Sequence, residues 1–172
     1  MPPRAGHTTR RPLYSPEERR RRDASPWTLV QGVLAPLQFL VFLVSLGLVI
    51  HYLLTGEALG AATASIITKT LILYAIMITG SIWEKDVFGR YLFARAFFWE
   101  DVVSMLVLAL HTAYLCTWMF GLAAPRTQML IALAAYASYA VNAGQFLLKL
   151  RAARHESVAA ESMMHTTSGV FE

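Results

Sequence analysis

Cysteine and charge are both scarce in this sequence, and each shortage excludes a class of protein. One cysteine in 172 residues leaves no disulfide framework and no metal site built on paired cysteines. Charged residues make up 15% of the chain and hydrophobic residues 56%, so polar side chains are too few to cover an ordinary soluble domain. We therefore predict an integral membrane protein. Cys116 lies inside an apolar run, where we expect an inert, small core residue.

Four apolar runs are long enough to cross a bilayer, which takes about 20 helical residues for a hydrocarbon core of roughly 30 Å. The predicted transmembrane helices cover residues 27–54, 61–83, 102–122 and 127–150. Before them lies a basic arm, residues 1–26, and after them a tail, residues 151–172, whose small and polar residues predict disorder. The predicted fold is thus all-α, with four transmembrane helices in one domain over residues 27–150.

The segment 84–101 separates the second and third runs and mixes charges of both signs with aromatic residues. Tryptophan and tyrosine are enriched where a membrane meets water, so we expect this segment at the membrane surface. Lysine and arginine number seven in the arm, three in this segment and three in residues 149–154, against none in residues 55–60 and one in residues 123–126. The positive-inside rule then places both termini and the segment 84–101 in the cytoplasm.

The basic arm carries the signals of a short helix. Ser15, Pro16 and Glu18 have the spacing of a capping box with proline at the first helical position, which predicts a helix through residues 19–22. Its arginines suit an anionic membrane surface, so we expect contact with lipid and no nucleic-acid partner.

Polar residues inside the predicted spans gather toward the cytoplasmic side. His111, Asn142 and Tyr74 lie roughly 12 to 13 Å from the cytoplasmic ends of their helices and Gln38 roughly 16 Å, while Gln145 is shallower. Helical spacing puts Glu100, Ser104 and His111 on one stripe, and Asn142 and Gln145 on another. These stripes predict one polar cavity that opens to the cytoplasm, with a substrate site lined by Gln38, Tyr74, Asn142 and Gln145.

Other interpretations of these polar residues stay open. The amides of Gln38, Asn142 and Gln145 also suit hydrogen bonds that merely join helices. His111 and Lys69 are ionisable residues inside spans, which favours a function, although Lys69 has a stem long enough to reach water at the membrane surface.

Three stretches of the chain resemble a known family. They are residues 13–49, LYSPEERRRRDASPWTLVQGVLAPLQFLVFLVSLGLV; residues 82–115, IWEKDVFGRYLFARAFFWEDVVSMLVLALHTAYL; and residues 139–154, YAVNAGQFLLKLRAAR. They are similar to the 3-vinyl bacteriochlorophyllide hydratase family of bacteriochlorophyll biosynthesis, and the resemblance covers nearly the whole chain. It implies a hydro-lyase that adds water to the C3 vinyl group of a magnesium tetrapyrrole, chlorophyllide a or 3-vinyl bacteriochlorophyllide a, giving a 3-(1-hydroxyethyl) group.

The resemblance also implies a multi-pass protein of the bacterial inner, photosynthetic intracytoplasmic membrane, in contact with other enzymes of the pathway. It supplies no catalytic residues. Two alternatives remain: a pigment-binding or scaffolding subunit without catalysis, and a small transporter that uses Lys69 and His111 in a proton path, which the lack of inverted repeats disfavours.

Hydration of a vinyl group requires an acid for the terminal carbon, stabilisation of the resulting cation and a base for the attacking water. No cofactor is needed, and none is expected. Our hypothesis is that Glu84 and Glu100 form the acid–base pair at the mouth of the cavity, with Asp101 as the substitute partner. His111 below them would ligate the substrate magnesium or position water, and the protein would have no metal of its own.

A tetrapyrrole with a propionate also needs a cation at the membrane surface. Lys85, Arg90 and Arg95 lie in the aromatic segment 84–101 and are candidates to bind this carboxylate.

Overall fold

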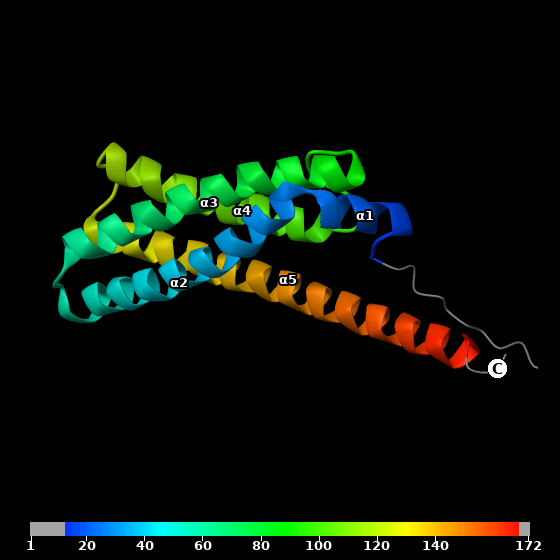
Figure 1. Ribbon diagram of the computed structural model, residues 1–172. Helices are drawn as coiled ribbons and strands as arrows, with labels where there is room; N and C mark the ends of the chain where they lie inside the picture. Colours follow the sequence, from blue (N-terminus) through cyan, green and yellow to red (C-terminus); the bar gives the residue numbers. More distant parts are fainter. Residues whose placement is uncertain (1–12, 169–172) are drawn as a thin grey trace, which may run out of the picture.

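The computed structural model describes residues 13–168, with side chains described as far as Arg154. Its helices are α1 (Pro16–Ala24), α2 (Pro26–Thr55), α3 (Leu59–Phe88), α4 (Phe98–Met119) and α5 (Pro125–Ser168) (Figure 1). Every regular element in this part of the chain is a helix. Four of them, counting α5 as far as Arg154, are long and apolar enough to cross a membrane. The all-α prediction and its four long apolar helices are confirmed.

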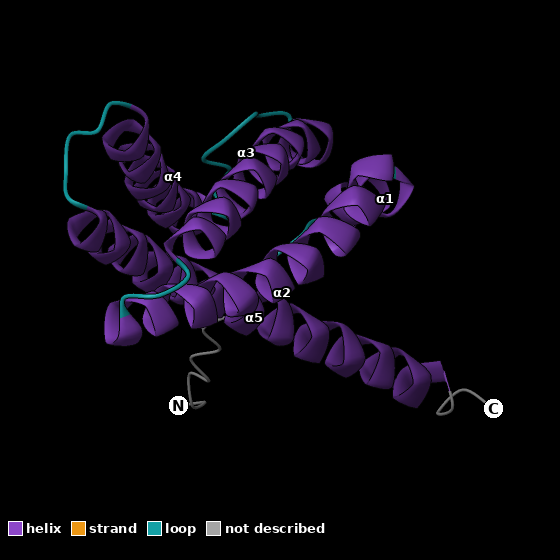
Figure 2. Ribbon diagram, turned by 90° about the vertical axis from the view of Figure 1, so that its left-hand side faces the viewer, coloured by secondary structure: helices purple, strands orange, loops and turns teal. Residues whose placement is uncertain are grey.

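The bundle consists of two closely packed helix pairs. α2 packs along α3 and α4 along α5, while α2 also contacts α5 and α1 lies against α3. α3 and α4 contact each other much less, although they are consecutive. Figure 2 shows the crossing of α2 over α5, and the loops that join the two helices within each pair lie at the end of the bundle away from α1 (Figure 1). One end of the bundle therefore carries both α1 and the connection between α3 and α4.

Local sequence signals account for several helix ends. The capping box predicted at the start of α1 is confirmed, because the Ser15 N–H donates to Glu18 Oε2 at 2.7 Å and the Glu18 N–H donates to Ser15 Oγ at 3.2 Å. α2 and α3 end at Gly56 and Gly89, whose φ angles of 79° and 77° are ones that only glycine adopts at little cost. Glycine thus ends each helix where the chain turns.

The helices run further than the apolar runs alone. α3 continues to Phe88 and α4 begins at Phe98, so only residues 89–97 of the charged segment form a connector. α5 continues to Ser168, into the tail for which the sequence predicted disorder, since this stretch is rich in alanine and has no glycine or proline before Gly169. Residues 1–12 of the basic arm lie outside the described residues.

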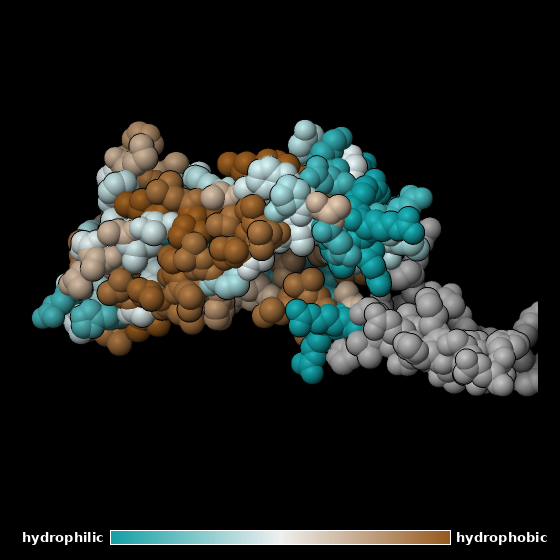
Figure 3. Space-filling view, viewed as in Figure 1, coloured by the Kyte–Doolittle hydropathy of each residue, from teal (hydrophilic) through white to brown (hydrophobic). Residues whose placement is uncertain are grey.

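Apolar side chains cover much of the outside of the bundle. Figure 3 shows them over the middle of the visible face, with hydrophilic side chains gathered at the end that carries α1. Cys116 belongs to the outside, so its prediction as a core residue is wrong. It is nine residues from the buried Val107, which places it on the opposite side of α4. This surface fits a helical membrane protein.

Candidate active site

Two carboxyl groups meet where α3 ends and α4 begins. Glu84 lies in the last two turns of α3 and Asp101 in the first turn of α4, and they are only 5% and 4% exposed. Each carboxyl group lies close enough to influence the charge of the other. Two buried negative charges at short range repel each other, which favours a proton on one of them. The pair is therefore suited to hold one proton and one negative charge.

The connector 89–97 folds back over this carboxyl pair. The Phe93 N–H donates to Asp101 Oδ2 at 2.7 Å, and the Ala94 N–H donates to Glu84 Oε2 at 3.2 Å. Phe93 has a φ of 59°, in the left-handed region that non-glycine residues seldom adopt. That conformation helps to direct consecutive amides to the two carboxyl groups. The connector thus both covers the pair and fixes the position of each carboxyl.

Glu100 has a different partner from the one that the sequence hypothesis gave it. Its Oε2 forms an ion pair of 2.6 Å with Lys149 Nζ of α5, and Lys149 also donates to the Ala96 carbonyl in the connector. Adjacent residues of a helix point about 100° apart, so Glu100 faces α5 whereas Asp101 faces α3. Asp101, the substitute in that hypothesis, is the carboxyl that meets Glu84.

Aromatic rings surround this end of the bundle. Phe97 lies at the centre, with its ring centroid 5.7 Å from that of Trp83, 5.9 Å from that of Phe88 and 5.8 Å from that of Phe146. Tyr14 stacks on Phe88 at 5.8 Å, and burial raises the pKa of its phenol. Next to the carboxyl pair there is thus an apolar cluster of rings, which Tyr14, two residues before α1, covers on one side.

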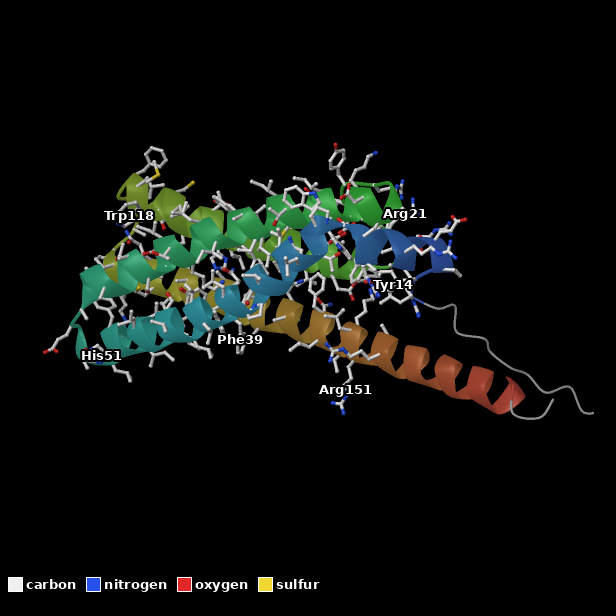
Figure 4. The ribbon with its side chains drawn as sticks, viewed as in Figure 1. Tyr14, Arg21, Phe39, His51, Trp118 and Arg151 are labelled. Atoms are coloured by element: carbon white, nitrogen blue, oxygen red, sulfur yellow. The ribbon has the colours of Figure 1, made fainter. Side chains whose placement is uncertain are left out.

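The cations predicted to bind a carboxylate lie on the outer face. Lys85, Arg90 and Arg95 are all exposed, and Lys85 Nζ donates to the Gly89 carbonyl at 3.1 Å while lying 5.3 Å from the ring centroid of Tyr91. In Figure 4, Tyr14 and Arg21 lie at this end of the molecule, whereas His51 and Trp118 lie at the other. The exposed cations, the rings and the carboxyl pair thus form one region.

A second group of polar residues lies deeper in the bundle. Glu100, Ser104 and His111 are buried along one face of α4, which confirms the predicted stripe. Ser104 Oγ donates to Asn142 Oδ1 at 3.3 Å, and Asn142 Nδ2 donates to the Glu100 carbonyl at 2.9 Å. Asn142 therefore joins α5 to α4, as the helix-joining interpretation expects.

His111 is held with one ring nitrogen free. Its Nδ1 lies 2.8 Å from the Val107 carbonyl, which fixes the proton on that nitrogen, and its Nε2 has no hydrogen-bond partner within residues 13–154. Gln38 lacks partners for both polar atoms, as Gln145 does for Oε1, among the same side chains. Tyr74 instead joins α3 to α4, with its hydroxyl 2.8 Å from that of Thr112. The free Nε2 has the lone pair that a metal carried by a ligand requires.

Sequence reasoning missed the part that Lys149 plays in this site. It placed this residue on the stripe of α5 that also carries Asn142, seven residues earlier, and counted its charge, but it gave Lys149 no partner. That spacing was a usable signal. The ring contacts of Lys69 with α2 and α5 had no such signal, because they depend on how separate helices pack.

Comparison with known proteins identifies relatives along nearly the whole chain. The family model described as 2-vinyl bacteriochlorophyllide hydratase matches residues 14–152. A protein of that name from Cereibacter sphaeroides is 63% identical over 162 residues, covering 94% of this chain and all of its own. One from Rhodobacter capsulatus is 61% identical over 163 residues, covering 94% of both chains. No solved structure matches the chain.

These names number the vinyl carbon 2 where the resemblance numbered it 3, and both describe hydration of a vinyl group on the same kind of macrocycle. The match includes α1, the connector 89–97, the buried carboxyl pair and α5 as far as residue 152. The chain belongs to the 2-vinyl bacteriochlorophyllide hydratase family.

Proposed function

We propose that this protein adds water across the vinyl group of a bacteriochlorophyllide-type magnesium tetrapyrrole, giving a 1-hydroxyethyl group. The observation that carries the proposal is 61% to 63% identity, over 94% of the chain, to two proteins named as hydratases of this substrate. Chlorophyllide a and 3-vinyl bacteriochlorophyllide a are the candidate substrates.

The carboxyl pair supplies both proton transfers. The protonated member of Glu84 and Asp101 gives its proton to the terminal vinyl carbon, which becomes a methyl group and leaves a cation at the adjacent carbon, delocalised into the macrocycle. Water attacks that carbon, and the ionised member of the pair takes the proton that the water loses. One water has then been added, and the pair again holds one proton. Glu100, neutralised by Lys149, maintains the geometry and has no part in proton transfer.

His111 suits the magnesium at the centre of the macrocycle. Its Nε2 is free, and its ring lies ten residues along α4 from Asp101, a rise of roughly 15 Å. A flat pigment lying lengthwise between the helices would bring its metal to His111 and one edge toward the carboxyl pair. Gln145, Asn142, Gln38 and Tyr74 then line its path.

The propionate of the pigment belongs with the exposed cations of the connector region. Lys85, Arg90 and Arg95 surround it with charge at the membrane surface, where a carboxylate keeps contact with water. Their position next to the ring cluster favours entry of the pigment from this end.

The membrane arrangement follows from the distribution of lysine and arginine. Both termini and the connector 89–97 face the cytoplasm, and lipid contacts the apolar outer surface. The bacterial inner, intracytoplasmic membrane of photosynthesis is the compartment where such a pigment is made. There the protein would meet the enzymes that supply its substrate.

Incubating the purified protein with the vinyl pigment tests the proposal. The absorption of the pigment should shift to the blue as vinyl conjugation is lost, and the product should gain the mass of one water. Glu84→Gln and Asp101→Asn should each lower turnover roughly 10²-fold while the protein stays folded, because each removes a titrating group with little change of shape. Glu57→Gln, at an exposed site on the opposite end, is the matched control.

Turnover that stays near that of the unaltered protein in both Glu84→Gln and Asp101→Asn would end the carboxyl-pair mechanism. If His111→Ala binds and converts the magnesium pigment normally, His111 is part of the helix packing alone. A protein that binds the vinyl pigment but forms no hydrated product would be a pigment-binding subunit instead.

A further inference from the structure

Three fully buried polar side chains from different helices converge in the middle of the bundle, each with at least one polar atom that lacks a hydrogen-bond partner. They are Gln38 of α2, Lys69 of α3 and His111 of α4. The free atoms are both side-chain polar atoms of Gln38, the ammonium of Lys69 and Nε2 of His111, counted over the described side chains. Buried polar atoms are nearly always paired, so this cluster marks a place that another molecule completes.

Lys69 is enclosed by rings. Its Nζ lies 3.8 Å from the ring centroid of Tyr139, 5.4 Å from that of Tyr136 and 5.7 Å from that of Phe42. Ring faces attract an ammonium but accept none of its hydrogen bonds in the way that an oxygen does. All three donors of Lys69 lack an acceptor within residues 13–154. The rings therefore hold the Lys69 ammonium in position, and a bound molecule would have to supply its hydrogen-bond acceptor.

The three residues lie close together. Two side-chain hydrogen bonds of 2.7 Å fix the register of the antiparallel helices α2 and α3, from Gln31 to Thr79 and between Ser45 and Ser65. In that register Gln38 lies opposite residue 72, within one helical turn of Lys69. The His111 ring lies 5.8 Å from the same Tyr136 ring that Lys69 contacts. Gln38 and Lys69 thus form a pair of donors near His111.

The carboxyl pair, His111 and Lys69 lie at increasing depth along the bundle when their backbone positions are compared. Lys69 precedes Glu84 by fifteen residues of α3, a rise of roughly 22 Å, whereas His111 follows Asp101 by ten residues of α4, roughly 15 Å. From the connector inward the order is therefore carboxyl pair, free imidazole nitrogen and free donors. A flat pigment that lies lengthwise would present its reacting edge, its metal and its opposite edge in the same order.

We infer that Lys69 and Gln38 bind a carbonyl oxygen on the edge of the tetrapyrrole away from the vinyl group. This inference rests on the proposed function. Lys69 and Gln38 Nε2 donate to the oxygen, while the rings of Phe42, Tyr136 and Tyr139 pack around the edge that carries it. Such a contact fixes which way round the pigment enters, because only one orientation satisfies the deep donors and brings the vinyl group to Glu84 and Asp101.

Binding of three pigments to the purified, full-length protein tests this inference. The pigments are the vinyl substrate, the same molecule with its ring ketone reduced to a methylene group, and its propionate methyl ester. Dissociation constants come from pigment absorbance. Lys69→Met should weaken binding of the substrate about 10-fold to 100-fold, the effect of losing a hydrogen bond to a charged donor. Gln38→Leu should weaken it less, and Arg126→Met, at an exposed site near the start of α5, should not.

The pigments then identify the oxygen. If the ketone is the acceptor, Lys69→Met should bind the ketone-reduced pigment as well as the unaltered protein does and keep its deficit with the methyl ester. A deficit that disappears with the ester instead would make the carboxylate the acceptor, which keeps the deep donor site but overturns its assignment to a carbonyl. Equal binding of all three pigments by Lys69→Met, Gln38→Leu and the unaltered protein would overturn the site and assign the cluster to internal water.

The outcomes also separate this inference from the proposed function. An unaltered protein that hydrates no vinyl pigment refutes the proposed function, and the inference falls with it. An unaltered protein that hydrates the pigment, beside a Lys69→Met variant with unchanged dissociation constants, refutes the inference alone. Removing a partnerless buried amine is compatible with folding, which thermal unfolding of each variant verifies.

Discussion

Replacing Lys149 by methionine should loosen the connector over the carboxyl pair. Lys149 pairs with Glu100 at 2.6 Å and donates to the Ala96 carbonyl, and its Nζ lies 4.9 Å from the Phe97 ring centroid. Methionine keeps the length and apolar character of the stem but leaves the Glu100 carboxylate and the Ala96 carbonyl without their donor. The change therefore removes the polar contacts of α5 with the connector while preserving the volume of the side chain.

The size of the effect follows from exposure. Removing one member of a buried ion pair costs about 3 to 5 kcal/mol, and an exposed pair contributes under about 1 kcal/mol. The side chains of Lys149 and Glu100 are 24% and 9% exposed, so the carboxylate that remains is mostly buried while water reaches the lysine position. We expect a loss of about 2 kcal/mol in the free energy of unfolding, or about 5 °C in the unfolding temperature.

Thermal unfolding in detergent micelles, followed by circular dichroism, measures this loss. Arg151→Met is the matched control, because Arg151 is exposed and points away from the bundle (Figure 4). Glu100→Gln should recover part of the loss when combined with Lys149→Met, giving a coupling energy of about 1 to 2 kcal/mol in the double-mutant cycle. Amide hydrogen exchange at Phe93 and Ala94 should accelerate, since both amides lie in the connector that Lys149 holds.

Two results would refute this reasoning. Lys149→Met could unfold at the temperature of Arg151→Met, which would make the ion pair energetically irrelevant. Alternatively, the double-mutant cycle could give no coupling, and the loss would then come from packing of the lysine stem and not from its charge.

Three further predictions concern Gly89, the arginines of the connector and the orientation of the bundle in the membrane. Gly89→Ala should destabilise the protein by about 1 to 2 kcal/mol, because φ is 77° there while no atom lies within 4 Å of the added Cβ; an unchanged unfolding temperature would contradict this. Arg90→Ala and Arg95→Ala should raise KM for the free-acid pigment and leave KM for its methyl ester unchanged. If neither variant changes KM for either pigment, these arginines act only as positive charges that set the orientation in the membrane. Reporter fusions should place Glu57 in the periplasm and Phe88 in the cytoplasm, and the reverse result would overturn the orientation.

Patterns local in sequence predicted much of the fold. The four apolar runs predicted four long helices, and the spacing of Ser15 and Glu18 predicted α1 with its cap. The stripe of Glu100 and His111 on α4 was predicted too, because it needs only the helical period. Such features depend on residues within a few turns of one another.

What the sequence could not decide was the rotation of each helix in the bundle. Glu100 and Asp101 are neighbours in the chain, and only the contact of α5 with α4 determines which of them faces Glu84. The same is true of Cys116, which the rotation of α4 puts on the outside. The left-handed conformation of Phe93 is likewise set by contacts across the connector, since phenylalanine has no preference for it.

The near-complete burial of Glu84 and Asp101 has an isotopic consequence. In the proposed mechanism, a pair sealed beneath the connector would exchange its proton with bulk water slowly, so the hydrogen that enters the methyl group in one turnover would be the one taken from the water of the turnover before. Protein equilibrated in ordinary water and then mixed with pigment in heavy water would place protium in the first methyl group and deuterium in the later ones. The isotope in each methyl group would thus report the solvent from which the pair took its proton in the preceding turnover.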